Sequence, residues 1–275
     1  MPWAISDWQD AGKEPVLRAL IEDIGSGDIT TNACIPADLR GEARFVAKQE
    51  MTLAGGELLT ILFSDVTLLK FSGDRIGPGD VLATVRADAR TLLTRERVSL
   101  NFLQRLSGIA TLAAKFVEAV DGTGVKILDT RKTTPGLRLL EKMAAAAGGA
   151  TNHRIGLFDA ILIKNNHIQL AGGVRNAIER AKSLGQPIEV EVRSRLEIED
   201  ALDCGAARLL LDNMTPEQAA LEVEFIAHRA QTEISGGVTL ANVRAYAEAK
   251  PDFISSGAIT HSATAVDINC GITSV

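Results

Sequence analysis

The sequence predicts an α/β protein in which a small α+β domain precedes a complete or incomplete (β/α) barrel. From about residue 125 onward, short apolar runs recur, each run ends in a polar or glycine-rich tip, and a helical pattern follows most of them. Strands that alternate with helices at this spacing form parallel βαβ units with right-handed crossovers. No G-x-G-x-x-G motif follows the first of these strands, which argues against a dinucleotide-binding fold.

The chain before about residue 115 has an irregular pattern, with glycine and proline between short strands. These residues mark tight turns and indicate a small α+β domain. The expected elements are a helix over 15–24, a polar loop over 25–36, a strand over 41–49, short strands within 71–89 and a helix over 90–108. The last helix has a candidate buried face, made of Leu93, Val98, Leu100, Leu103 and Leu106.

The expected barrel strands come from the second part of the chain. Their runs are VKILD, DAILI, PIEVEV, ARLLLD, QTEIS and PDFIS, with tips near residues 131, 164, 191, 212, 235 and 256. The carboxyl ends of parallel barrel strands open on one common face, where barrel enzymes carry their active sites. The polar side chains at these tips are therefore the candidate functional residues.

Composition and charge exclude several classes of function. The chain of 275 residues has a formal net charge of −6 and no long run of Lys and Arg, so neither nucleic acid nor an anionic membrane is an expected partner. Its cysteines, Cys34, Cys204 and Cys270, are odd in number and widely spaced, which argues against a disulfide framework and fits a reducing compartment. Because we find neither a secretory signal nor an apolar run of about 18 residues, we expect a cytoplasmic protein.

Potential cations gather at three of the expected strand tips and loops. Arg131 and Lys132 follow the first strand, His153 and Arg154 lie in TNHRIGL, and Lys164 ends the second strand. Unit charges about 6 Å apart repel by roughly 3 kcal/mol at an effective dielectric constant near 20. One alternative is that the cations point apart into water and that His153 is a structural group. The other is that they form a binding site for a multiply charged anion. Their position on separate tips of one face favours the anion site.

Acidic residues lie on two other expected strands. Glu189 and Glu191 are two residues apart and share one side of their strand, and inward carboxylates are costly to bury without a partner. Asp212, at the end of the next strand, can join Glu191 in holding Mg²⁺, directly or through water. The alternative is an internal salt bridge from Glu191 to Lys164 or Lys132.

Two glycine-rich tips complete the expected face. Ser235, Gly236 and Gly237 end one strand, and SSGA at 255–258, which contains Gly257, ends the next. Glycine after a strand is first of all a turn residue. Two such tips at successive strand ends nevertheless indicate a phosphate cradle of backbone N–H groups. The residues alone thus predict a barrel enzyme for phosphorylated and anionic substrates, without naming its reaction.

Longer motifs resemble a known family. The runs DTRKTTPGLRLLEK, GGATNHRIGLFDAILIKNNHI, EVEV, LLLDN, ISGGV and SSGAITHS are similar to those of quinolinate phosphoribosyltransferase, also called nicotinate-nucleotide pyrophosphorylase (carboxylating). The likeness covers nearly the whole chain. It implies an N-terminal α/β sandwich over 1–110, joined by the C-terminal tail 265–275, and a seven-stranded α/β barrel over 111–264.

The resemblance also implies an activity. In this family the phosphoribosyl group moves from phosphoribosyl pyrophosphate to quinolinate with decarboxylation, which gives nicotinate mononucleotide, pyrophosphate and CO₂ for NAD biosynthesis. The resemblance implies Mg²⁺ as cofactor and a homodimer or larger assembly. Arg97, in ERVSLN, matches an arginine that the family contributes across the subunit interface.

Matched positions assign roles within the chain. The positions implied to hold the two carboxylates of quinolinate are Arg131, His153, Arg154 and Lys164. The positions implied to be catalytic are Lys132, which lies near both substrates, and the acidic pair Glu191 and Asp212 near the ribose and the Mg²⁺-pyrophosphate. The positions implied to cradle the 5′-phosphate are Ser235, Gly236, Gly237 and Gly257.

Two positions depart from the family pattern, and other functions remain open. Asn165 stands where the family usually has aspartate, and Ile234 where a small residue is usual. The nearest alternative is a related family of molybdate transport operons. A non-catalytic barrel that senses an anionic metabolite would gain nothing from the acidic pair, and a sugar-phosphate aldolase or isomerase would need a Schiff-base lysine such as Lys164 or a lone carboxylate base.

Overall fold

The computed structural model describes residues 4–275, and they form two compact units. Unit 1 extends to Ala114 and also includes Thr133–Gly149 and Ser262–Val275. Unit 2 consists of Lys115–Lys132 and Ala150–His261. No helix in the described part of the chain has the length and apolar content that a bilayer crossing requires.

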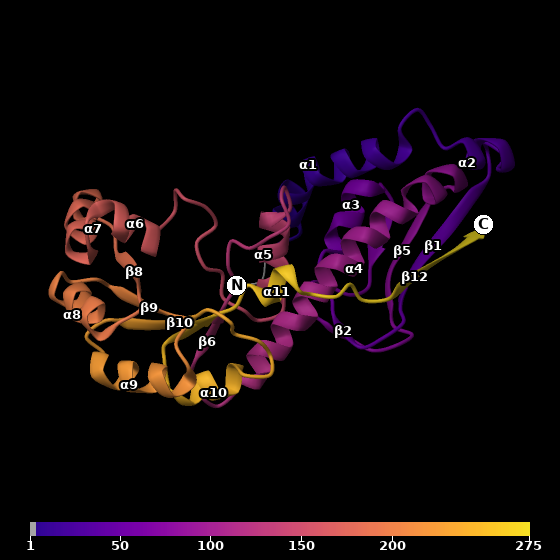
Figure 1. Ribbon diagram of the computed structural model, residues 1–275. Helices are drawn as coiled ribbons and strands as arrows, with labels where there is room; N and C mark the ends of the chain where they lie inside the picture. The colour runs from indigo at the N-terminus through magenta and orange to yellow at the C-terminus, as the bar shows by residue number, and fades with distance from the viewer. Residues whose placement is uncertain (1–3) are drawn as a thin grey trace. The chain divides into compact units, whose positions relative to one another are not determined.

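Unit 1 is built on an antiparallel sheet with the order β12-β1-β5-β3. Its strands are β1 (Arg40–Ala47), β3 (Val66–Leu68), β5 (Val81–Asp88) and β12 (Ile268–Ser274). A two-stranded ribbon pairs β2 (Met51–Thr52) with β4 (Arg75–Ile76). The last strand of the chain pairs with β1 from Gly41–Ser274 to Ala47–Ile268, and Figure 1 shows the yellow β12 beside the indigo β1.

Unit 1 also contains helices. They are α1 (Ile5–Ile24), α2 (Ile29–Cys34), the 3₁₀ turn η1 (Gly56–Leu58), α3 (Leu59–Leu62), α4 (Ala89–Ala119) and α5 (Arg138–Ala147). The expected start of the first helix at Pro15 was wrong, because Pro15 lies inside α1 although proline favours the first helical turn. The expected polar loop was also wrong over 29–34, where Asp28 accepts a hydrogen bond from the Thr31 N–H at 2.9 Å and caps α2.

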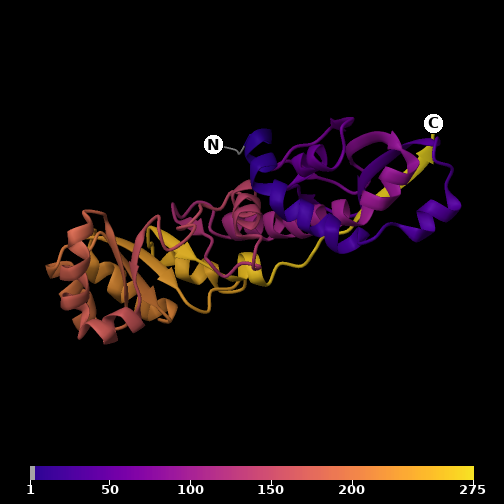
Figure 2. The same cartoon turned by 90° about the horizontal axis from the view of Figure 1, so that it is seen from above.

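Unit 2 contains a parallel sheet with the order β6-β11-β10-β9-β8-β7. The strands are β6 (Lys126–Leu128), β7 (Ile161–Ile163), β8 (Ile188–Val192), β9 (Arg208–Asp212), β10 (Gln231–Ser235) and β11 (Phe253–Ser255). The helices are α6 (Asn165–Ala171), α7 (Val174–Ala181), the 3₁₀ turn η2 (Lys182–Leu184), α8 (Arg195–Asp203), α9 (Pro216–Ile226), α10 (Val243–Glu248) and α11 (Ala258–His261). Figure 1 and Figure 2 show α7, α8, α9 and α10 on the outer side of the strands of unit 2.

Six parallel strands agree with the predicted α/β fold, but the seventh barrel strand is reduced to a single bridge. Leu128 of β6 pairs with Thr151 in a parallel bridge, and no ladder joins Thr151 to β7 among residues 4–275. The pairing stops because the His153 N–H donates to Asp129 Oδ1 at 2.8 Å and Asn152 Nδ2 donates to Asp129 Oδ2 at 2.7 Å. A side chain thus takes the backbone donor that a strand would need.

The register of β8, β9 and β10 assigns their side chains to two faces. Paired residues of parallel strands lie on the same face, and the register pairs Glu189 with Arg208, Leu210 with Glu191 and Glu233, and Asp212 with Ser235. We call the polar face the inner face; it carries Glu189, Glu191, Arg208, Asp212, Glu233 and Ser235. The opposite face is buried and carries Ile188, Val190, Val192, Leu209, Leu211, Thr232 and Ile234.

A close backbone contact in unit 1 generates a stability prediction. A Cβ at Gly108, inside α4, would lie 2.2 Å from the Thr264 carbonyl oxygen. Alanine for glycine normally stabilises a helix by up to about 1 kcal/mol, but here overpacking should destabilise by roughly 1–3 kcal/mol. We expect Gly108→Ala to lower the urea midpoint, followed by the fluorescence of Trp8, which is buried in unit 1.

Gly271→Ala is the matched control, because a Cβ there meets nothing within 4 Å. Its urea midpoint should stay close to that of the wild type. A Gly108→Ala protein as stable as the wild type would mean that the 262–275 segment does not pack against α4 in solution.

Candidate active site

The deepest polar group on the inner face is the cluster of His153, Glu189 and Glu233. His153 Nε2 lies 3.3 Å from Glu189 Oε2 and 3.5 Å from Glu233 Oε2, and the three side chains are 10, 9 and 0% exposed. Burial lowers the pKa of His153, but the two carboxylates together raise it to about 9. Burial raises the pKa of Glu189. The cluster therefore holds a proton at neutral pH.

Arg208 supplies the permanent positive charge of this cluster. Its Nη1 lies 3.5 Å from Glu233 Oε2 and 3.9 Å from Glu189 Oε2. The guanidinium also stacks over the Phe253 ring, 4.1 Å from the ring centroid. Once His153 carries its second proton, one arginine and one histidine balance the two buried carboxylates, which removes most of the cost of burying them.

The same three groups have the composition of a metal site, since one ligand atom from each of His153, Glu189 and Glu233 lies within 4.8 Å of the others. The hydrogen bonds of the ring argue against this interpretation. The Arg154 N–H donates to His153 Nδ1 at 2.7 Å, so the ring proton is on Nε2 and faces the carboxylates. A protonated Nε2 has no lone pair for a metal ion. The cluster is therefore an ion-pair group.

Protonation changes what His153 can bind. A second proton must enter at Nδ1, which turns that nitrogen from an acceptor into a donor. The Arg154 N–H, now 2.7 Å away, would then have to move. Uptake of a proton below a pKa of about 9 thus makes a charged N–H of His153 available to an anion.

An acidic pair lies nearer the open ends of the strands. Arg193 Nη2 lies 2.9 Å from Glu191 Oε1 and 2.8 Å from Asp212 Oδ2, and Arg193 Nε donates to Asp212 Oδ2 at 3.0 Å. The sequence predicted that Glu191 and Asp212 come together, and the structure brings them together on one cation. The alternative of a salt bridge from Glu191 to Lys164 or Lys132 was wrong about the partner, which is Arg193.

Sequence reasoning missed Arg193, although a signal for it was present. Arg193 follows Glu191 by two residues, so it continues the side of β8 that carries Glu189 and Glu191. Its position beyond the end of β8 made it resemble a solvated loop residue. Glu233 lies two residues before Ser235 and on the same face of β10. It was missed because its partners come from distant parts of the chain.

Two of the predicted cations form a basic corner. The nearby charge of Arg131 lowers the pKa of Arg154, an effect second only to that of burial. Arg154 Nη1 donates to the Ala160 carbonyl oxygen at 3.2 Å, whereas Arg131 Nε is buried and has no hydrogen-bond partner among the described residues. Like charges held close together with an unpaired buried donor are the surroundings that an anion would complete.

Lys132 lies against one of the two glycine tips. A Cβ on Gly257 would meet Lys132 Cδ at 2.7 Å, and the Lys132 carbonyl oxygen accepts a hydrogen bond from Thr260 Oγ1 at 2.8 Å. At the other tip, Gly236 has φ +96° and a Cβ there would lie 2.3 Å from Asn213 Oδ1. Gly236 therefore sits where only a residue without a side chain fits, whereas a side chain at Gly257 would displace that of Lys132.

The remaining residues singled out in the sequence lie on α4, on β10 and at the start of α6. Lys164 precedes α6 and is exposed; its backbone N–H donates to His167 Nδ1 at 2.9 Å. Asn165 is the first residue of α6. Ile234 points away from the inner face into the buried layer, so its size does not bear on the Ser235 tip. Arg97 is exposed on α4 of unit 1.

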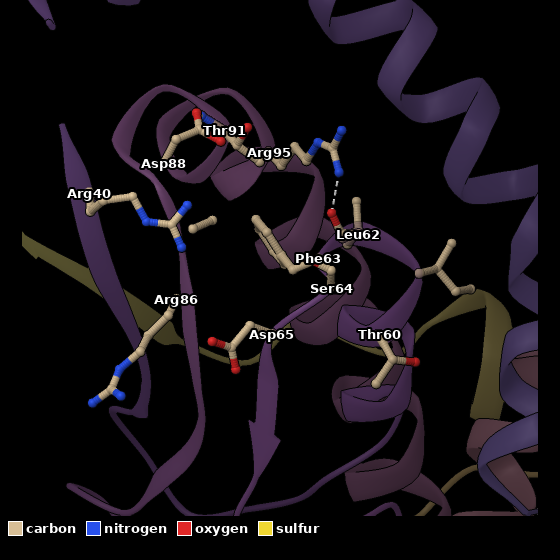
Figure 3. Close-up of a pocket in the computed structure, with 12 residues that line it drawn as sticks. Arg40, Thr60, Leu62, Phe63, Ser64, Asp65, Arg86, Asp88, Thr91 and Arg95 are labelled. Atoms are coloured by element: carbon tan, nitrogen blue, oxygen red, sulfur yellow. Dashed lines mark hydrogen bonds between the residues drawn. The ribbon is translucent and has the colours of Figure 1, made fainter. Parts of the chain in front are cut away.

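Another pocket, of about 460 Å³, lies within unit 1. In Figure 3, Arg40 and Asp65 point toward its middle, while the guanidinium of Arg95 donates to the Leu62 carbonyl oxygen. Arg86, on the rim, pairs with Glu42 at 2.9 Å. None of the predicted site residues lines this pocket.

The histidine cluster generates a prediction for titration. The imidazole signals of His153 should titrate with a midpoint near pH 9 by NMR, because two carboxylates hold its proton. Glu233→Gln should lower this midpoint by about one unit or more, since an adjacent opposite charge shifts a pKa by roughly 1–3 units. Because the folded pKa is raised, the ion pair stabilises the fold below about pH 6.5 and this stabilisation is lost as the pH rises through about 9.

His228 is exposed and provides the matched control. His228→Gln should remove one imidazole signal and leave the His153 midpoint unchanged. A wild-type midpoint close to 6.5 for His153 would contradict the ion-pair cluster.

Known proteins share both the sequence and the fold of this chain. The family descriptions "Quinolinate phosphoribosyl transferase, N-terminal domain" and "C-terminal domain" match residues 28–107 and 109–270. The "Probable nicotinate-nucleotide pyrophosphorylase [carboxylating]" of Bacillus subtilis (strain 168) is 40% identical over 92% of this chain and 90% of its own length. The chloroplastic nicotinate-nucleotide pyrophosphorylase of Arabidopsis thaliana is also 40% identical, over 94% of this chain and 82% of its own.

Solved structures agree. NadC from Streptococcus pyogenes superposes with a TM-score of 0.91 at 38% identity, over 97% of this chain and 98% of its own. The nicotinate-nucleotide pyrophosphorylase from Francisella tularensis gives 0.91 at 37% identity, over 96% of this chain and 97% of its own. The chain therefore belongs to the quinolinate phosphoribosyltransferase family.

Proposed function

We propose that this chain transfers the phosphoribosyl group of phosphoribosyl pyrophosphate to the ring nitrogen of quinolinate and releases pyrophosphate and CO₂. The product, nicotinate mononucleotide, is a precursor of NAD. One observation carries the proposal: the inner face holds the acidic pair Glu191 and Asp212 on a single cation. Family membership over nearly the whole chain supports it. The three free cysteines support a cytoplasmic location.

The basic corner is the proposed site for the two carboxylates of quinolinate. Arg131 offers a buried Nε without a partner among the described residues, and Arg154 lies close enough for its pKa to respond to Arg131. A dianion would relieve the repulsion between them and satisfy the unpaired donor. His153, once protonated at Nδ1, adds a further charged donor, and Lys164 contributes its ammonium group.

The acidic pair is the proposed site for the ribose. Departure of pyrophosphate leaves positive charge on the anomeric carbon, and carboxylates fixed beside it stabilise that charge. Glu191 and Asp212 are 9 and 13% exposed, so water screens them only in part. Lys132, beside the Gly257 tip, would offset negative charge on the phosphates. Ser235, Gly236 and Gly237 would offer backbone N–H groups to the 5′-phosphate.

The acidic pair also fits the Mg²⁺ that this family implies. Its ligands are hard carboxylate oxygens, and two of them converge on one cationic point, occupied here by Arg193 Nη2. Bound there, Mg²⁺ would supply charge neutralisation for the pyrophosphate. Glu191 and Asp212 would hold it, directly or through water.

Decarboxylation requires little further from the protein. After the ring nitrogen attacks the sugar, it is cationic. When CO₂ leaves, the electron pair of the broken C–C bond stays on the adjacent ring carbon, where the cationic nitrogen stabilises it until a proton from water replaces the carboxylate. Arg131 and Arg154 need only keep the ring in place, because orientation is the main contribution of the site to this step. The reaction needs no Schiff base, so the proposed role of Lys164 is to offer its positively charged ammonium group to the carboxylates of quinolinate.

The proposed reaction predicts a strict choice of substrate. With quinolinate, phosphoribosyl pyrophosphate and Mg²⁺ the protein should release pyrophosphate and CO₂, and with nicotinate in place of quinolinate it should release almost none. Arg131→Met should lower kcat/KM for quinolinate roughly 10- to 100-fold, because losing a charge-assisted hydrogen bond costs about 1.5–3 kcal/mol.

Arg180→Met is the control, since Arg180 is exposed on α7 and should leave kcat/KM unchanged. Binding of quinolinate without release of CO₂ or pyrophosphate would identify a sensor. Borohydride labelling of Lys164 with a sugar phosphate would identify an aldolase.

Another prediction concerns assembly. We propose a homodimer or larger assembly in which Arg97 completes the site of the neighbouring subunit. Arg97→Ala and Lys132→Ala should each be inactive alone. Their mixed dimers should recover activity, because one of the two sites then contains both wild-type residues. Mixed dimers without activity would show that Arg97 and Lys132 serve the same subunit.

A further inference from the structure

Arg193 stands in a position that the proposed roles of its neighbours do not explain. Its guanidinium makes three contacts of 2.8–3.0 Å with the acidic pair Glu191 and Asp212. The side chain of Arg193 is 48% exposed, whereas those of Glu191 and Asp212 are 9 and 13% exposed. The arginine therefore reaches in from solvent and covers the two carboxylates.

This contact conflicts with the ligands expected at the acidic pair. Both Mg²⁺ and an anomeric carbon that is gaining positive charge would approach the same carboxylate oxygens. A guanidinium at 2.8–2.9 Å from Glu191 Oε1 and Asp212 Oδ2 occupies that space and repels a second cation. The two cannot be present together in this arrangement.

We propose that Arg193 is an internal counter-ion of the acidic pair, and that a divalent cation must displace it to bind. The proposal rests on the proposed function, which assigns Glu191 and Asp212 to the cation and the ribose. Arg193 compensates half of the negative charge of the two carboxylates while no ligand is bound, so neither carboxylate stays unpaired. Its presence sets how tightly the cation binds.

The loop after β8 allows the side chain to leave while its backbone stays fixed. The Arg193 N–H donates to Glu197 Oε2 at 2.7 Å, which holds the main chain against the start of α8. Beside the guanidinium lies a pocket of about 560 Å³, and Ser194, Gln218 and Glu222 are among its lining residues. Rotation about side-chain bonds can carry the guanidinium into this pocket, away from Glu191 and Asp212.

The test measures binding of Mn²⁺, as a probe for Mg²⁺, to the whole protein without substrates by electron paramagnetic resonance. Arg193→Met removes the charge and Arg193→Gln keeps a hydrogen-bond donor without it. Both should tighten Mn²⁺ binding on the order of tenfold, as expected for loss of a competing charge-assisted ion pair. The double variant Arg193→Met with Glu191→Gln should lose this gain.

Arg195→Met is the matched control. Arg195 pairs with Glu222 at 2.6 Å and stacks over Phe225, so its loss removes a neighbouring positive charge without touching the acidic pair. Its Mn²⁺ affinity should remain that of the wild type. Equal tightening by Arg195→Met would mean that general electrostatics, and not displacement, governs the affinity.

Several outcomes overturn the proposal. Mn²⁺ affinity in Arg193→Met that equals or falls below the wild-type value, or no Mn²⁺ binding in either protein, would show that Arg193 does not compete with the cation. A raised KM for phosphoribosyl pyrophosphate with unchanged Mn²⁺ affinity would instead make Arg193 a ligand of the pyrophosphate.

The product assay separates this test from that of the proposed function. Wild-type protein that forms no nicotinate mononucleotide, together with tightened Mn²⁺ binding in Arg193→Met, would reject the function and retain the counter-ion. Normal product formation by the wild type, together with unchanged Mn²⁺ binding in Arg193→Met, would retain the function and reject the counter-ion.

Discussion

Carboxylates buried on neighbouring parallel strands need compensating cations, and this requirement organises the inner face of unit 2. Glu189, Glu191, Asp212 and Glu233 come from β8, β9 and β10 and share one face because of the strand register. An isolated buried charge would cost more than the whole stability of a typical domain. The cations of this face are therefore part of the fold as much as of the site.

Glu233 and Asp212 differ both in depth and in the kind of cation that each receives. Glu233, which is fully buried, has partners fixed by the fold: Arg208 from the neighbouring strand and His153 from the loop that replaces the seventh strand. Asp212, nearer solvent at 13% exposure, is paired with a half-exposed arginine on a loop. The deeper group is suited to holding a permanent charge, and the outer one to exchanging its cation for a ligand.

Local sequence signals predicted the strand tips well, because a strand followed by a polar tip is encoded within eight or so residues. Glu191, Asp212 and the Gly236 tip were found in this way. The ion pairs depend on register between strands far apart in the chain, so Arg208 and Glu233 gave no local signal. Helix α2 was missed because its capping Asp28 lies within a run of turn residues.

The loop between β6 and β7 places acidic and basic side chains on the same face. If residues after Thr151 had continued as a regular strand, their N–H groups would have been used in the ladder, and His153 could not have donated its N–H to Asp129. Breaking the strand turns the His153 ring toward Glu189 and Glu233 while the next residue, Arg154, stays half-buried near Arg131. The missing strand is thus the structural reason why acidic and basic groups meet on one face.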